Sequence, residues 1–221
     1  MLFRSSTVAQ PSSWVLAEPN FADTRYTYIS GTSMATPLVA GCAAQLRELL
    51  GRRHNQYAPS AALMKALLIN SAHDLRGQYS PSECAATPNF AEGYGRVNLD
   101  SVLQAGTDLH LLSNEEHELD TGECRDFMLE VAAGQSLRVT LVWTDPPGDR
   151  LQNDLDLTVT DAAGTIRLGN GTPTSNQPDR VNNVEQVTWD NPAAGTVTIR
   201  VSAYNITQGN GQDFALVARV F

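Results

Sequence analysis

Apolar residues in the first half of the chain recur at a spacing near 3.6, which predicts α-helices over residues 32–50, 60–75 and 98–104. The first of these helices begins with small, apolar residues and carries charges only after Gln45. We therefore expect it to start buried on all sides and to end at the surface. Ser60 stands at the start of the second helix and is expected to cap it.

After Gly106 apolar and polar residues alternate instead. The segments "SLRVTLVWTD", "NDLDLTVTD", "TVTIRVSAY" and "DFALVARVF" each place apolar side chains on one face, and turn sequences such as "DPPGD" and "NPAAG" recur between them. Six to eight short antiparallel strands with such turns predict a β-sandwich or jelly roll. The change of period predicts two domains, at residues 1–106 and 107–221.

The composition excludes two kinds of partner. The 221 residues carry a net charge of −9, which argues against nucleic acid as a partner. No run of 18 or more apolar residues is present, and the opening "MLFRSS" turns polar at once. We therefore expect no membrane partner and no secretory signal within this chain.

The sequence "GTSMATP" contains a candidate nucleophile, Ser33. At the start of a buried helix, the backbone N–H groups beside a serine are ready to stabilise an oxyanion. Gly31 would let a substrate carbonyl approach closely. An N-cap role explains a serine in this position without any chemistry. The residues alone leave both interpretations open.

Acidic and amide side chains in the second half form a candidate cation site. Asp154 and Asp156 lie two apart on a predicted strand and project to the same face. Asn183 and Glu185 follow in "RVNNVE". Carboxylate and amide oxygens without nearby His or Cys suit Ca²⁺, which takes six to eight oxygen ligands. The alternative is a solvated strand face with asparagines that form turns.

The longer segment "GTSMATPLVAG" resembles the active-site serine segment of the subtilisin-like serine proteases, the subtilases. "SAALMKALLINSA" and "GYGRVNLDSVL" are similar to the next helix and to the closing turn and last helix of that family. The second half resembles the C-terminal jelly-roll domain of alkaline subtilases, in which calcium is often bound. The resemblance covers about residues 2–221. It implies an α/β remnant of a subtilisin-like domain, mostly helices, followed by an all-β jelly-roll or β-sandwich domain.

The resemblance also assigns site residues. It implies Ser33 as the nucleophile, the Ser33 N–H as one oxyanion donor and the Thr32 hydroxyl as an auxiliary donor. The family's catalytic Asp, His and oxyanion Asn segments are absent, and all four histidines follow Ser33. We therefore expect the C-terminal part of a subtilase, cut before the serine, and expect the isolated chain to be inactive.

Three functions remain open at this point. The first is a fragment of a serine endopeptidase whose complete form hydrolyses polypeptide substrates. The second is a non-catalytic, calcium-stabilised β-sandwich with a residual protease half that acts in binding or stabilisation. The third is an independent hydrolase that recruits another base, such as His73, to Ser33.

Three further expectations concern location and stability. The resemblance implies a secreted or extracellular protein. The β-domain has its own alternating core, so we expect it to fold alone. Residues 1–106 would lack most of the family's parallel sheet, so we expect them to be the less stable unit and to associate through the uncovered face or a leftover strand edge.

Overall fold

The computed structural model describes residues 31–75, 86–103, 108–172 and 177–221. Within these ranges there are three helices, α1 (Thr32–His54), α2 (Ala61–Asn70) and α3 (Asp100–Leu103). Eight strands follow: β1 (Leu109–Leu119), β2 (Cys124–Val131), β3 (Leu137–Val142), β4 (Asn153–Thr160), β5 (Ile166–Leu168), β6 (Val184–Trp189), β7 (Gly195–Ile206) and β8 (Gln212–Val220).

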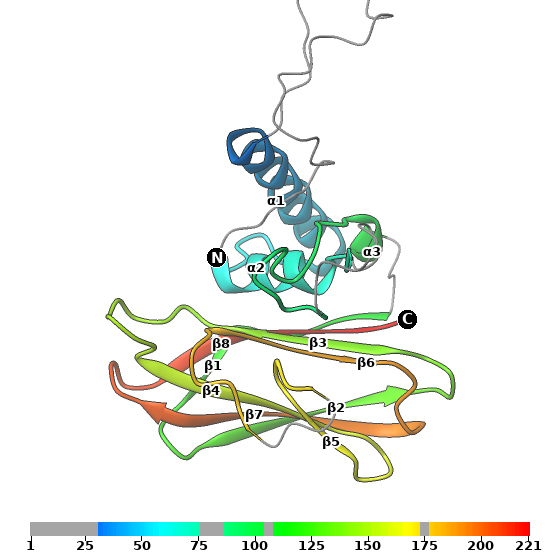
Figure 1. Cartoon of the computed structure of the whole chain (residues 1–221), viewed down its shortest axis with the longest axis vertical. Helices are drawn as coiled ribbons and strands as arrows, with labels where there is room; N and C mark the ends of the chain where they lie inside the picture. The colour runs from blue at the N-terminus through cyan, green and yellow to red at the C-terminus, as the bar shows by residue number, and fades with distance from the viewer. Residues whose placement is uncertain (1–30, 76–85, 104–107, 173–176) are drawn as a thin grey trace, which may run out of the picture.

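The strands form two antiparallel sheets that face each other (Figure 1). One sheet has the order β1-β8-β3-β6 and the other the order β2-β7-β4-β5. Consecutive strands therefore often lie in different sheets, and the first strand pairs with the last. This order is that of a jelly roll of two Greek keys. The predicted β-sandwich is confirmed.

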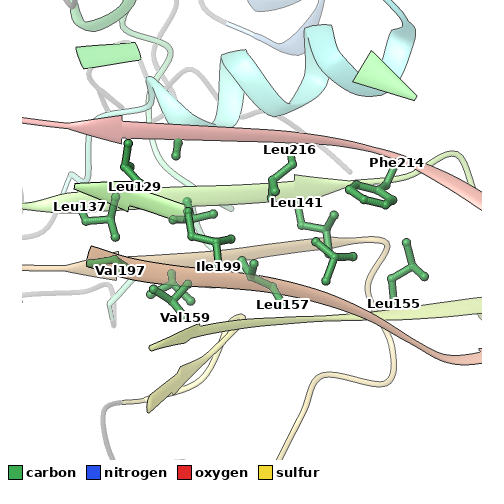
Figure 2. Close-up of a cluster of buried hydrophobic side chains, with 14 of the residues drawn as sticks. Leu129, Leu137, Leu141, Leu155, Leu157, Val159, Val197, Ile199, Phe214 and Leu216 are labelled. Carbon is green, nitrogen blue, oxygen red and sulfur yellow. The ribbon is translucent and has the colours of Figure 1, made fainter. Parts of the chain in front are cut away.

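Alternation along the strands builds the core between the two sheets. Residues from β3 and β8 point inward from one sheet, and residues from β4 and β7 point inward from the other (Figure 2). Their neighbours in sequence point to the outer faces, because side chains alternate along a strand. The labelled core residues are Leu129, Leu137, Leu141, Leu155, Leu157, Val159, Val197, Ile199, Phe214 and Leu216.

A second core lies on the outer face of the β1-β8-β3-β6 sheet, where α2 packs (Figure 1). Leu63, Ala66 and Leu67 of α2 are buried there. The outward-facing Ala215 and Val217 of β8 belong to the same cluster. The helical half and the sandwich therefore share one hydrophobic core.

Hydrogen bonds connect the C-terminal end of α2 to the sandwich. The Asn70 Nδ2 donates to the Arg138 carbonyl oxygen at 3.1 Å and to the Thr140 hydroxyl at 3.1 Å. In return, the Arg138 guanidinium donates to the carbonyl oxygens of Asn70, at 3.1 Å, and of Ala72, at 2.7 Å. A guanidinium is favourable at this position because the last carbonyls of a helix lack intrahelical partners and carry partial negative charge.

The predicted fold class is wrong for the first half of the chain. The described residues are 39% strand and 22% helix, so the molecule is mostly β and the subtilase part is not mostly helical. No parallel sheet occurs in the described part of that half, where the only pairings are the antiparallel bridges His73–Arg96 and Asn89–Gly93. A parallel sheet needs a long crossover for each strand. Residues 86–99 form turns and bridges instead.

The burial predicted for the first helix is also wrong, because it is reversed. The start of α1 extends away from the sandwich, and Met34 and Leu38 are exposed (Figure 1). The buried residues cluster near the other end, at Leu46, Leu49 and Leu50, where α1 meets the second core. Small apolar residues reveal that a helix can be covered, but they do not reveal which element covers it.

The predicted cap of the second helix is confirmed. The Ser60 Oγ accepts a hydrogen bond from the Leu63 N–H at 3.0 Å. Replacing Ser60 with alanine should lower the free energy of unfolding by about 1 kcal/mol, because one N–H of the first turn loses its partner. Ser60→Asp, which can accept the same bond, should restore most of that loss. Equal urea midpoints for the alanine and aspartate variants would contradict this role.

Candidate functional site

The candidate nucleophile Ser33 lies in the first turn of α1. Gly31 occupies the N-cap position, and its carbonyl oxygen accepts from the N–H groups of Met34 and Ala35, both at 3.1 Å. Capping therefore does not account for Ser33. Its side chain is exposed at the positive end of the helix dipole. The neighbouring Thr32 is exposed as well, and its carbonyl oxygen accepts from the Thr36 hydroxyl at 2.8 Å.

The described structure places no base beside Ser33. All four histidines belong to the described ranges, and none of them forms a hydrogen bond with Ser33 there. His54 lies at the opposite end of α1, about 30 Å away at 1.5 Å per residue. His73 pairs with Arg96 through the backbone, and the His117 ring packs against Phe127. In the described residues, this serine has helix N–H groups nearby but no partner to take its proton.

The two aspartates of the predicted cation site lie together on β4. Their neighbours Leu155 and Leu157 belong to the core, so the carboxylates point to the outer face of the β2-β7-β4-β5 sheet. Arg180 forms ion pairs with both Asp154 and Asp156. Burial raises the pKa of Asp154 to about 6, and the positive charge of Arg180 acts in the opposite direction.

Glu185 and Asn183 have other partners. Glu185 is buried on β6, where one carboxylate oxygen, Oε2, accepts from the Leu157 N–H at 2.6 Å. The other, Oε1, is buried and has no hydrogen-bond partner among the described residues. Burial raises the pKa of Glu185 well above its usual value. The Asn183 Nδ2 donates to the Trp143 carbonyl oxygen at 3.0 Å, and its Oδ1 accepts from the Lys65 ammonium at 3.4 Å.

These contacts fit a calcium ion poorly. Within the described ranges, no group of three or more His, Cys, Asp or Glu side chains is arranged to hold a metal. Arg180 binds the two aspartates, and the amide oxygen of Asn183 faces the cation of Lys65. The calcium site therefore stays a prediction, and its four proposed ligands do not form one cage.

Sequence reasoning missed Arg180. It lies 24 residues from Asp156 and 26 from Asp154, in the connection between β5 and β6. No local periodicity connects such distant positions. The one signal is that Arg180 is the only Lys or Arg between residues 168 and 199, in a chain with excess acidic residues.

Two family models match separate parts of the chain. Residues 7–95 match the model of the subtilase family, and residues 125–203 match that of the bacterial pre-peptidase C-terminal domain. The chain is 28% identical to the serine protease/ABC transporter B family protein tagD of Dictyostelium discoideum, over 72% of this chain and 12% of that protein. It is 36% identical to the subtilisin-like protease SBT2.5 of Arabidopsis thaliana, over 40% of this chain and 12% of the relative.

Solved structures offer only a weak likeness. The periplasmic lysozyme inhibitor PliG of Aeromonas hydrophila aligns with a TM-score of 0.29 and 15% identity, over 48% of this chain and 82% of that one.

The two matches follow one another along the chain, and the second falls within the β-sandwich. Residues 7–95 are similar to part of the subtilase domain, as the serine motif predicted, and this match covers less than half of the chain. The chain spans about an eighth of the length of the curated relatives named above. None of the helices in the described ranges has the length and apolar character needed to cross a membrane.

Proposed function

We propose that this chain supplies the nucleophile of a serine endopeptidase that hydrolyses peptide bonds in polypeptide substrates. The observation that supports this most is the exposed Ser33, within "GTSMATP" and inside the segment that matches the subtilase family. In this reaction the Ser33 oxygen attacks the scissile carbonyl carbon and loses its proton to a base. The Ser33 N–H and the Thr32 hydroxyl would then stabilise the negative oxygen of the tetrahedral intermediate.

The chain alone is proposed to be inactive. A serine hydroxyl without a base is a weak nucleophile, and loss of catalytic-triad members typically lowers kcat by a factor of about 10⁴–10⁶. The missing hydrogen bond between Ser33 and any histidine in the described ranges supports this proposal.

A fluorophosphonate probe tests both parts of the proposal. The purified chain should be labelled no faster than its Ser33→Ala variant. A chimera in which residues 7–95 replace the matching segment of the Arabidopsis protease SBT2.5 supplies the missing groups. We expect this chimera to be labelled, and Ser33→Ala to abolish the labelling.

Either of two outcomes would contradict the proposal. Labelling of the isolated chain that depends on Ser33 would show that a base is already present. A folded chimera that is not labelled would show that Ser33 is not a nucleophile, and its circular dichroism spectrum distinguishes this result from misfolding.

A second candidate is a non-catalytic module. The complete jelly-roll core, with strands from both sheets, supports a stable β-sandwich that acts in binding or stabilisation. An independent hydrolase that uses His73 has less support, because the described contacts place His73 against Arg96. Secretion is part of the proposal and rests on the two matched domains. Self-association through the exposed Met34 and Leu38 is proposed on their exposure.

A further inference from the structure

On the outer face of β4, the positive charge beside the two aspartates is the side chain of Arg180. The guanidinium of Arg180 lies against the carboxylates of Asp154 and Asp156, with Nη1 3.4 Å from the Asp154 Oδ2 and in direct contact with the Asp156 Oδ1. The side chains of the two aspartates are only 12% and 17% exposed. Two carboxylates that are so near and so poorly hydrated need a positive charge between them.

The ring of Tyr204 on β7 also packs against the Arg180 guanidinium. The central carbon of the Arg180 guanidinium lies 3.7 Å from the centre of the Tyr204 ring. A planar guanidinium can stack on an aromatic face while its N–H groups bind carboxylates, whereas a metal ion and a lysine ammonium are point charges with no planar face to stack. The shape and chemistry of the position therefore match a guanidinium.

The other predicted calcium ligands do not complete an oxygen cage here. The Asn183 amide oxygen accepts from Lys65, and one oxygen of Glu185 accepts from the Leu157 N–H. The remaining Glu185 oxygen is buried and unpartnered among the described residues, but one oxygen does not supply the six to eight ligands that calcium takes. A divalent ion would also have to displace Arg180 from both aspartates.

We propose that Arg180 is the built-in cation of this site and takes the place that a metal ion would otherwise occupy. Because Arg180 lies between β5 and β6, its ion pairs join that connection to β4, and its stacking on Tyr204 joins it to β7. The sandwich then needs no calcium to neutralise Asp154 and Asp156. This assignment is independent of the peptidase function and of Ser33.

The test uses the full chain and its melting temperature. The wild-type melting temperature should be the same in 5 mM calcium chloride as in chelator. Arg180→Ala should lower it by about 4–8 °C, because two poorly hydrated carboxylates lose their counter-charge. Ethylguanidinium at about 20 mM should restore part of this loss, while sodium chloride of equal ionic strength should not.

Two variants serve as controls. Arg200 forms an ion pair with Asp126 on the same sheet face, but its side chain is 50% exposed. Arg200→Ala should therefore change the melting temperature little, with no rescue by ethylguanidinium. Arg180→Lys keeps the charge and provides a folded comparison if Arg180→Ala does not fold. It should melt below the wild type and remain insensitive to calcium.

Three results would overturn the assignment. The first is a wild-type melting temperature that rises in calcium, together with an Asp154→Asn variant whose melting temperature does not respond to calcium. This result would support the predicted metal site instead. The second is an Arg180→Ala variant as stable as the wild type. The third is an Arg180→Ala variant that is destabilised but does not respond to ethylguanidinium more strongly than Arg200→Ala does.

Discussion

Replacing Leu67 with aspartate is expected to unfold most of the molecule, with a loss of more than about 4 kcal/mol in the free energy of unfolding. Leu67 is fully buried in the core that α2 shares with the outer face of the β1-β8-β3-β6 sheet. An aspartate there would leave an unpaired carboxylate in an apolar environment, which is among the most destabilising single changes. Urea denaturation followed by circular dichroism and by tryptophan fluorescence measures the loss.

The matched control is the same substitution on an exposed helix position. Leu38 of α1 is 63% exposed, so Leu38→Asp should change the free energy of unfolding by no more than about 0.5 kcal/mol. The opposite outcome is a Leu67→Asp variant that loses helical signal while its strands unfold at the wild-type midpoint. That result would support the sequence expectation of a β-domain that folds alone, and would contradict the shared core.

Replacing Trp143 with alanine should cost about 3–5 kcal/mol. This residue follows β3 and is buried among the residues between the two sheets. Its indole Nε1 donates to the Asn153 carbonyl oxygen at 2.8 Å, so the ring also fixes the start of β4. Trp143→Phe keeps much of the volume but leaves the Asn153 carbonyl without this donor, and should cost about 1–3 kcal/mol.

Met128 provides the comparison for the tryptophan series. It lies on β2 with 73% of its surface exposed, so Met128→Ala should leave the urea midpoint almost unchanged. If Trp143→Phe were as destabilising as Trp143→Ala, the hydrogen bond rather than the volume of the ring would account for the stability. If both variants were as stable as the wild type, the position of Trp143 in the core would be wrong.

The strands could be predicted from the sequence because side chains along an extended chain point alternately to its two faces. Leu137, Val139 and Leu141 must share one face of any extended chain, and the structure places that face between the sheets. The layout of the first half could not be predicted in this way. A helical period identifies apolar positions, as in α1 and α2, but not the surface that covers them. The resemblance implied a mostly helical remnant, whereas the described residues of that half also form turns and antiparallel bridges.

Site residues could be predicted where their signal is local in the sequence, and not where it depends on distant contacts. Ser33 could be found because its signal is a continuous motif, and Asp154 and Asp156 could be placed on one face because they are two apart on a strand. Arg180 could not be found because its partners on β4 and β7 are distant from it in sequence and lie beside it only in the folded sandwich. Asn183 was assigned as a metal ligand by composition, whereas its contacts depend on the positions of Lys65 and Trp143.

The position of β8 has a consequence for how the chain is made. In the β1-β8-β3-β6 sheet, β8 lies between β1 and β3 and pairs with both along most of their lengths. During synthesis, β1 and β3 therefore emerge with no partner between them until residues 212–220 leave the ribosome. The surface that α2 packs against also includes β8, so α2 cannot bury its apolar residues there until β8 is in place. Folding of both halves should thus depend on the emergence of β8, and ribosomes stalled before residue 212 should present a protease-sensitive chain.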